Sequence, residues 1–127
     1  MTVLGSAGDA TVNGAVAAGV KHGKKVVADL IGVVDRIDRA RELWKLGVAF
    51  VELYAGLDEQ AQPGYSLQML LDDGRIAGVA FSIAGVTIET VSAVRDAGAD
   101  VTVASGETYN TADPAAAAKA LEDALGI

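Results

Sequence analysis

Five short apolar runs recur along the chain, and each is followed by a segment whose apolar residues have helical spacing. The runs are Thr2–Gly5, Lys25–Val33, Phe50–Ala55, Val79–Ala84 and Asp100–Ala104. They are nearly continuous instead of alternating, which is typical of parallel strands that are buried on both faces. The pattern therefore predicts a parallel α/β sheet built from five strand–helix units.

Residues that favour helix starts and stops frame these units. The predicted starts are capping residues, namely Asp9, Asp35, Thr87 and Asp113, the last followed by Pro114 at the first helical position. The predicted stops are glycines, namely Gly23, Gly47, Gly74, Gly98 and Gly126. Two helices are thereby bounded as Arg36–Leu46 and Ile88–Ala97, and Gly56–Tyr65 is the longest irregular stretch. Asn13-Gly14 and Gly19 disfavour the helix that follows Asp9.

The length of 127 residues suffices for one domain, and no linker-like stretch divides the chain. Residues 1–127 are therefore predicted to form a single domain. A complete (β/α)₈ barrel has eight strands and runs to roughly 250 residues. Five units in this length fall short of such a barrel.

The composition excludes several classes of function. The net charge of −7 argues against nucleic acid as a partner, because phosphate backbones are bound by basic faces. The absence of cysteine excludes disulfides, thiolate nucleophiles and cysteine metal sites. No apolar run approaches the roughly 20 residues of a membrane span. The first residues also lack a signal-peptide pattern, so a cytoplasmic protein without membrane partners is expected.

Ligands of parallel α/β sheets bind at the carboxyl ends of the strands. The loops predicted at that edge are Gly5–Asp9, Gly32–Asp35, Ala55–Gln62, Ala84–Thr87 and Ser105–Asp113. Two of them suit phosphate, because Ala84-Gly85 and Ser105-Gly106 each lead from a strand toward a helix, where backbone N–H groups bind anions. The alternative is that these glycines only make tight turns.

Asp29 lies within an apolar strand, where an unpaired carboxylate is costly. It is a candidate acid/base or sugar-hydroxyl ligand if it points into a site. The alternative is a structural ion pair with a lysine or arginine on a neighbouring strand.

Glu52 and Tyr54 share one face of the third predicted strand, because they alternate with Val51 and Leu53. Tyr54 lies nearer the carboxyl end, where its hydroxyl is placed to donate a proton or to hydrogen-bond a sugar. A buried tyrosine with a satisfied hydroxyl is the alternative.

Three other features are interpreted as structural. His22, the only histidine, is predicted in the last turn of the first helix, at the opposite end of the sheet from the loops. Trp44 is predicted to lie in the core or in an interface. Gly5-Ser6-Ala7-Gly8 lacks the spacing of a dinucleotide-binding loop.

Five runs, in one order along essentially the whole chain, resemble the 3-hexulose-6-phosphate synthases, a family of the orotidine-monophosphate-decarboxylase superfamily. The runs are Thr2–Ser6, Val26–Val33, Phe50–Gln60, Phe81–Gly85 and Ala112–Lys119. The resemblance implies a partial TIM (β/α) barrel, whose five parallel β/α units correspond to strands four to eight of the family.

The resemblance also implies chemistry. Enzymes of the family are aldehyde-lyases that condense formaldehyde with ribulose 5-phosphate, and a Mg²⁺ ion stabilises the enediolate of the sugar. On this likeness Asp29 and Tyr54 are the candidate catalytic residues. The candidate phosphate-binding residues are Ala84, Gly85, Ser105 and Gly106.

The sequence departs from the family in several places. The family's first three strands, which carry the metal ligands and a D-x-K-x-x-D motif, have no counterpart here, so no metal ligand is assigned in this chain. Tyr54 stands where the family has histidine. Ser105 replaces the first glycine of the strand-eight pair, and the strand-seven loop has one glycine where the family has two.

Three interpretations remain. In the first, the chain is part of a synthase-type lyase and has little or no turnover alone. In the second, it is a non-catalytic half-barrel remnant or assembly module, whose exposed sheet edges favour a homodimer or another association. In the third, it resembles 3-keto-L-gulonate-6-phosphate decarboxylase. Asp29 and Leu57 disfavour the third, because that enzyme tends to carry glutamate and arginine at these places.

Overall fold

Strands and helices alternate along the chain in the order that the apolar runs predict, and the computed structural model describes all 127 residues. The strands are β1 (Thr2–Leu4), β2 (Val27–Asp29), β3 (Phe50–Leu53), β4 (Phe81–Ala84) and β5 (Val101–Val103). The helices are α1 (Asp9–Lys21), α2 (Arg36–Lys45), α3 (Leu57–Gln60), α4 (Leu67–Ala77), α5 (Val91–Asp96), α6 (Gly106–Tyr109) and α7 (Pro114–Leu125).

The five strands form one parallel sheet in the order β1-β2-β3-β4-β5. This confirms the predicted parallel α/β architecture. One row of paired residues crosses the whole sheet, and it consists of Leu4, Asp29, Glu52, Ser82 and Val101. Residues paired in a parallel register point to the same side of the sheet, so these five side chains share one face.

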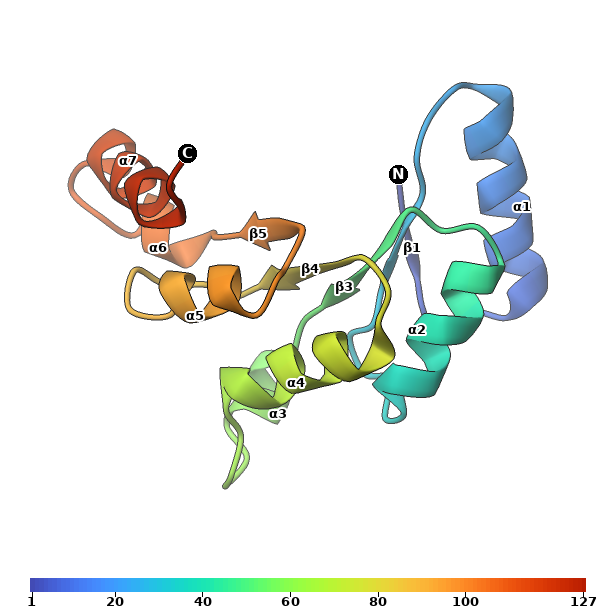
Figure 1. The fold of residues 1–127 in the computed structure, drawn as a ribbon, viewed down its shortest axis with the longest axis horizontal. Coiled ribbons are helices and arrows are strands. Elements are labelled where there is room, and N and C mark those ends of the chain that lie inside the picture. The colour runs from blue at the N-terminus through green and yellow to red at the C-terminus, as the bar shows by residue number, and fades with distance from the viewer.

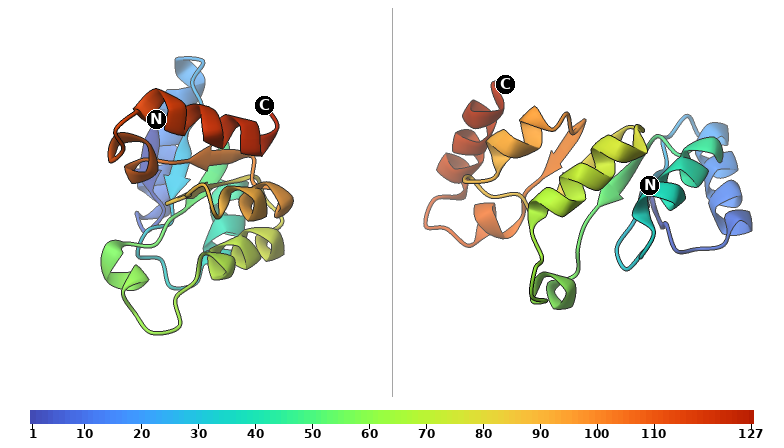
Figure 2. Two further views of the ribbon diagram at one scale, coloured as in Figure 1. Left: turned by 90° about the vertical axis from the view of Figure 1, so that its left-hand side faces the viewer. Right: turned by 60° about the horizontal axis from the view of Figure 1, so that its bottom comes forward.

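The opposite face is covered by α1, α2, α4, α5 and α7, whereas the short helices α3 and α6 lie in the loops after β3 and β5. The covering helices follow the outer side of the curved sheet from α1 at one end to α7 at the other (Figures 1 and 2). The core lies between sheet and helices and includes Leu43 of α2, Val51 of β3, Leu71 of α4 and Ile83 of β4. The inner face carries no helix, so the fold is an open arc of β/α units.

The open inner face corrects one prediction from the apolar runs. Only β4 is buried at every residue, whereas β1 and β5 are exposed at alternate positions. Leu4, Val101 and Val103 point to the uncovered face and are 55%, 39% and 36% exposed. The strands β1 and β5 thus carry apolar residues on both faces, but this chain buries only the face that packs against the helices.

The glycine stops are largely confirmed. Gly23, Gly47, Gly98 and Gly126 have positive φ after a helix, as predicted. The prediction for Gly74 is wrong, because α4 continues through it to Gly78. At Gly74 an added Cβ would lie 2.9 Å from the side chains of Leu53 and Phe81, so this glycine allows α4 to approach the sheet closely.

Two other boundaries differ from the prediction. Helix α5 begins at Val91 and not at the predicted Ile88, because the Oγ1 of Thr90 accepts the Thr87 N–H at 2.9 Å and closes a turn first. The irregular stretch 56–65 contains the short helix α3.

The capping predictions have mixed outcomes. The Asp113 carboxylate accepts the Ala116 N–H at 3.0 Å and caps α7, as predicted. Asp35 precedes α2 but makes no capping bond, and α1 begins at Asp9 with Gly8 as its N-cap.

The helix disfavoured by its glycines forms nonetheless. At Gly19 an added Cβ would lie 2.8 Å from the carbonyl oxygen of Lys24, so α1 needs glycine there to pack against the start of β2. His22 follows α1 as its C-cap, at the end of the sheet away from the loops. Trp44 is 46% exposed, so it is not a core residue.

Candidate functional site

The candidate residues all lie at one edge of the sheet. Asp29 is the last residue of β2, Tyr54 follows β3, Ala84 ends β4, and Ser105-Gly106 begins α6 after β5. Because the strands are parallel, their carboxyl ends meet at the same edge. The structure therefore places the sequence candidates on neighbouring strands in the predicted arrangement.

Asp29 and Glu52 form a carboxylate pair on the open face. They are partners in the β2–β3 register, and neither side chain takes part in a salt bridge. Burial raises the pKa of the Glu52 carboxyl, and the negative charge of Asp29 raises it further. The alternative of a structural ion pair for Asp29 is thus contradicted.

A turn holds the Asp29 side chain in place. Its Oδ1 accepts the N–H of Ile31 at 2.9 Å, two residues further along the chain. A carboxylate that accepts a backbone N–H has one oxygen fixed, while its other oxygen stays available for a ligand. This geometry suits a residue that binds a sugar hydroxyl or transfers a proton at the sheet edge.

Ser82 extends the polar row, and no pattern in the sequence indicated it as a site residue. It follows Glu52 in the β3–β4 register, is buried, and its Oγ lies 3.5 Å from the Val51 carbonyl oxygen. The only indication in the sequence is that Ser82 is the one polar residue of the apolar run Phe81–Ala84. Three polar side chains therefore lie in line across the centre of the open face.

Tyr54 lies beside the first candidate phosphate loop. An added Cβ at Gly85 would be 4.0 Å from Cε2 of the tyrosine ring. Tyr54 is half-buried, and its hydroxyl makes no hydrogen bond in the structure, unlike the satisfied buried tyrosine of the alternative interpretation. The Tyr54 hydroxyl therefore has no partner within the chain.

The two candidate phosphate loops present free backbone donors. The N–H groups of Gly85, Ser105 and Gly106 make no hydrogen bond within the chain. Gly85 has φ +79°, a left-handed conformation that strongly favours glycine. The turn alone accounts for that glycine, so the unbonded N–H groups are the better indication of anion binding.

The chain does not assemble a metal site. No group of three or more His, Cys, Asp or Glu side chains is placed to hold an ion. Asp29 and Glu52 supply only two neighbouring carboxylates, whereas oxygen-ligated Mg²⁺ is six-coordinate. The residues of this chain therefore do not fit a Mg²⁺ ion by themselves.

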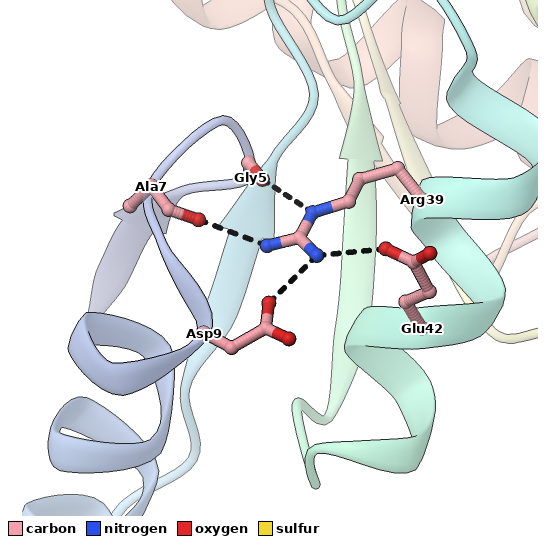
Figure 3. Close-up of polar contacts among 5 residues, drawn as sticks. All are labelled: Gly5, Ala7, Asp9, Arg39 and Glu42. Carbon is pink, nitrogen blue, oxygen red and sulfur yellow. Dashed lines mark hydrogen bonds and ion pairs between the residues drawn. The ribbon is translucent and has the colours of Figure 1, made fainter.

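Arg39 of α2 holds the loop that follows β1 (Figure 3). Its guanidinium donates to the carbonyl oxygen of Gly5 at 2.7 Å and to that of Ala7 at 2.9 Å. It also pairs with Asp9 and Glu42, each at 2.8 Å, and these two carboxylates raise the pKa of Arg39. The Gly5–Asp9 loop is thereby fixed by one side chain of the next unit.

Arg36, the first residue of α2, holds the segment that follows β3. It pairs with Glu59 of α3 and, at 3.5 Å, with Asp73 of α4, and its side chain is only 11% exposed. Burial raises the pKa of Asp73, and Arg36 partly offsets that increase. The segment after Tyr54 is therefore held to α2 and α4 by buried charge.

The surface has two open hollows, and neither contains a candidate residue. The larger, of about 440 Å³, lies between the loops after β1 and β2 and is lined by Asp35, Asp38, Arg39 and Glu42, among others. The smaller, of about 400 Å³, lies at the other end of the sheet beside Asp100. The candidate site is thus part of the open face and not an enclosed cavity.

No helix combines the length and the apolar character that crossing a bilayer requires.

Comparisons with known proteins give close matches to part of one enzyme. The chain is 56% identical over 126 residues to the 3-hexulose-6-phosphate synthase of Mycobacterium gastri, which covers 98% of this chain and 61% of that protein. A crystal structure of 3-hexulose-6-phosphate synthase, also 56% identical, matches with a TM-score of 0.94 over 98% of this chain and 60% of that one. No family model matches the chain.

A more distant structure shows the same fold. The 3-keto-L-gulonate-6-phosphate decarboxylase of Vibrio cholerae O1 biovar El Tor is 17% identical and has a TM-score of 0.71 over 98% of this chain and 59% of that one. The chain thus spans about 60% of the length of the curated relatives it matches. Its five β/α units correspond to part of a TIM barrel.

Proposed function

We propose that this homologue of the 3-hexulose-6-phosphate synthases, which spans about 60% of their length, carries the sugar-phosphate half of a lyase site. The complete site would condense formaldehyde with ribulose 5-phosphate. The observation that carries the proposal is that unbonded loop N–H groups and Asp29, which has no ion-pair partner, lie at one edge of the sheet.

The phosphate would bind to the loops after β4 and β5. Gly85, Ser105 and Gly106 offer N–H donors that have no partner in the chain, and two such loops side by side can hold an anion from both directions. The sugar would then extend over the open face toward Tyr54 and Asp29. There Asp29 would bind a sugar hydroxyl or move a proton, and Tyr54 would donate one.

Turnover by this chain alone is proposed to be very low. The aldol chemistry of the relatives requires stabilisation of an enediolate, which the family likeness assigns to Mg²⁺, and this chain does not assemble the ligands. A complete barrel has eight strands, so three β/α units are lacking for closure. Those units, in a longer protein or another chain, would contribute the metal side of the site.

Two alternatives remain to be tested. The uncovered sheet face, with Leu4, Val101 and Val103 exposed, favours an assembly module that associates as a homodimer or through its free edges. A decarboxylase-like activity is the other alternative. It has less support, because the decarboxylase structure is 17% identical and the synthase relative is 56% identical.

The test combines binding and turnover in the purified chain. Ribulose 5-phosphate and unphosphorylated ribulose are titrated by calorimetry, and formaldehyde-dependent consumption of ribulose 5-phosphate is followed with and without Mg²⁺. The expected result is binding that requires the phosphate, without measurable turnover. Mg²⁺-dependent turnover would contradict the proposed division of the site, and equal or no binding of both sugars would favour the assembly module. Release of CO₂ from 3-keto-L-gulonate 6-phosphate would identify the decarboxylase.

A further inference from the structure

A carboxylate from the candidate phosphate loop after β5 contacts the segment that follows the candidate phosphate loop after β4. Glu107 directly follows Ser105-Gly106, and its Oε1 accepts the backbone N–H of Ile88 at 3.2 Å. Ile88 belongs to the turn that follows Gly85. A negatively charged side chain therefore bridges the two loops that we assign to the phosphate.

The other backbone N–H groups of the loop after β4 do not contact a charged side chain. Thr87 donates its N–H to the neutral Oγ1 of Thr90 at 2.9 Å, and Gly85 donates its N–H to no group. Glu89 is also close, but its Oε2 accepts the hydroxyl of Thr87 at 3.1 Å and no backbone N–H. Glu107 is thus the one anion that occupies a backbone donor of these loops.

A phosphate on the N–H groups of Gly85, Ser105 and Gly106 would bind next to that carboxylate, because Glu107 directly follows Gly106 and contacts Ile88, three residues after Gly85. Two negative charges within a few ångströms of each other repel, and near a protein surface this repulsion is stronger than in bulk water. A bound phosphate must either displace Glu107 from Ile88 or bind beside an uncompensated negative charge. Both routes weaken the binding of an anion.

We propose that Glu107 is an intramolecular competitor for the phosphate, and that it lowers the affinity of the two loops for phosphorylated sugars. The proposal rests on the proposed function of these loops. Glu107 occupies the Ile88 N–H in the free chain and swings away when a phosphate binds. It is therefore a specificity-determining residue, because it opposes anionic ligands and has no such effect on neutral sugars.

The test uses the full chain with inorganic phosphate and ribulose 5-phosphate as probes. Dissociation constants are measured by calorimetry for the wild type, Glu107→Gln, Glu107→Ala and the matched control Glu89→Gln. Glu107→Gln and Glu89→Gln remove the same charge from the same region, but only Glu107→Gln alters the contact with Ile88. We expect both Glu107 variants to bind phosphate about tenfold more tightly, a factor that corresponds to about 1.4 kcal/mol. Glu89→Gln should change the affinity less than about threefold.

The possible failures are distinguishable. Wild-type binding that Glu107→Gln and Glu107→Ala leave unchanged, or that Glu89→Gln tightens equally, would overturn the role of Glu107 and leave the proposed function intact. Absence of phosphate binding in all four proteins would overturn both. A direct readout is the amide resonance of Ile88, which should move on substitution of Glu107 and on addition of phosphate to the wild type. A resonance that stays in place in both experiments would also contradict the proposal.

Discussion

Asp29 and Glu52 are register partners on adjacent parallel strands, and no cationic side chain of this chain compensates their two carboxylates. Like charges on neighbouring positions of one sheet face destabilise the fold. The pair is tolerated because the face is open, which leaves both groups partly hydrated. Any group that covers this face therefore has to supply positive charge or accept a protonated carboxyl.

We predict that Glu52→Gln stabilises the chain at neutral pH and not at acidic pH. Since the pKa of Glu52 is raised in the folded chain, the folded state binds more protons than the unfolded state between the ordinary and the raised pKa. Stability is therefore lost as the pH rises through this window, and glutamine removes the loss. Thermal unfolding at pH 4 and pH 7 should give a higher Tm for the variant only at pH 7. An equal change at both pH values would contradict the assignment.

A pair of glycines in α1 should respond in opposite directions to alanine. Gly19→Ala would place Cβ 2.8 Å from the Lys24 carbonyl oxygen, so it should cost about 1–3 kcal/mol through displaced backbone. Gly14→Ala meets no atom within 4 Å and should gain about 0.5–1 kcal/mol from helix propensity. Urea denaturation followed by circular dichroism measures both. Similar effects at the two positions would show that α1 does not pack against β2 as described.

Replacement of Arg36 should loosen the segment that follows Tyr54. Arg36→Met keeps most of the apolar stem but leaves Glu59 and Asp73 without their partner, at a cost of about 1–3 kcal/mol. Limited proteolysis should then cut within residues 56–65 sooner than in the wild type. Arg75→Met is the control, because Arg75 is exposed and makes no ion pair. Equal cleavage of both variants would argue against the contact.

We predict that lysine cannot replace the guanidinium group of Arg39. Lysine retains the charge but cannot bind the carbonyl oxygens of Gly5 and Ala7 and the carboxylate of Asp9 at the same time. Arg39→Lys should destabilise the chain by about 1–2 kcal/mol. Hydrogen exchange should quicken in residues 5–12 and remain unchanged in α7. Uniformly faster exchange would indicate a global and not a local role.

The uncovered face should promote self-association. Leu4 and Val103 are exposed on it, so Leu4→Lys combined with Val103→Lys should shift sedimentation toward the monomer at a given concentration. Val20→Lys and Val34→Lys are matched controls, because these valines are exposed but lie outside the sheet. A monomeric wild type, or the same shift in the controls, would exclude association through this face.

Much of the fold follows from local signals in the sequence. Strand positions are recovered because buried parallel strands are short apolar runs, and the helix stop at Gly47 is recovered because a left-handed residue there favours glycine. Gly74 is also a glycine, but for a different reason: a larger side chain there would clash with Leu53 and Phe81. The sequence alone does not show whether a glycine is required for a positive φ, as at Gly47, or for close packing, as at Gly74.

The candidate site was predictable in position and not in its interactions. Asp29 stands out as a charge within an apolar run, so its location at the sheet edge could be inferred. Arg36 contacts Glu59, 23 positions away in the chain, and Arg39 contacts Gly5, 34 positions away. Arginines of this kind look like ordinary residues of a solvated helix face in the sequence. The same holds for Glu107, whose importance depends on the distance to a backbone N–H.

The order of the strands in space is identical to their order in the chain. Contacts between units therefore join neighbours in sequence, such as α2 with α4 and α5 with α7, as in a solenoid of repeats. Folding of such an array can start at any interface and propagate in both directions, with little entropy lost in closing long loops. For evolution, the same modularity means that a unit gained or lost at either end leaves every remaining interface as it was.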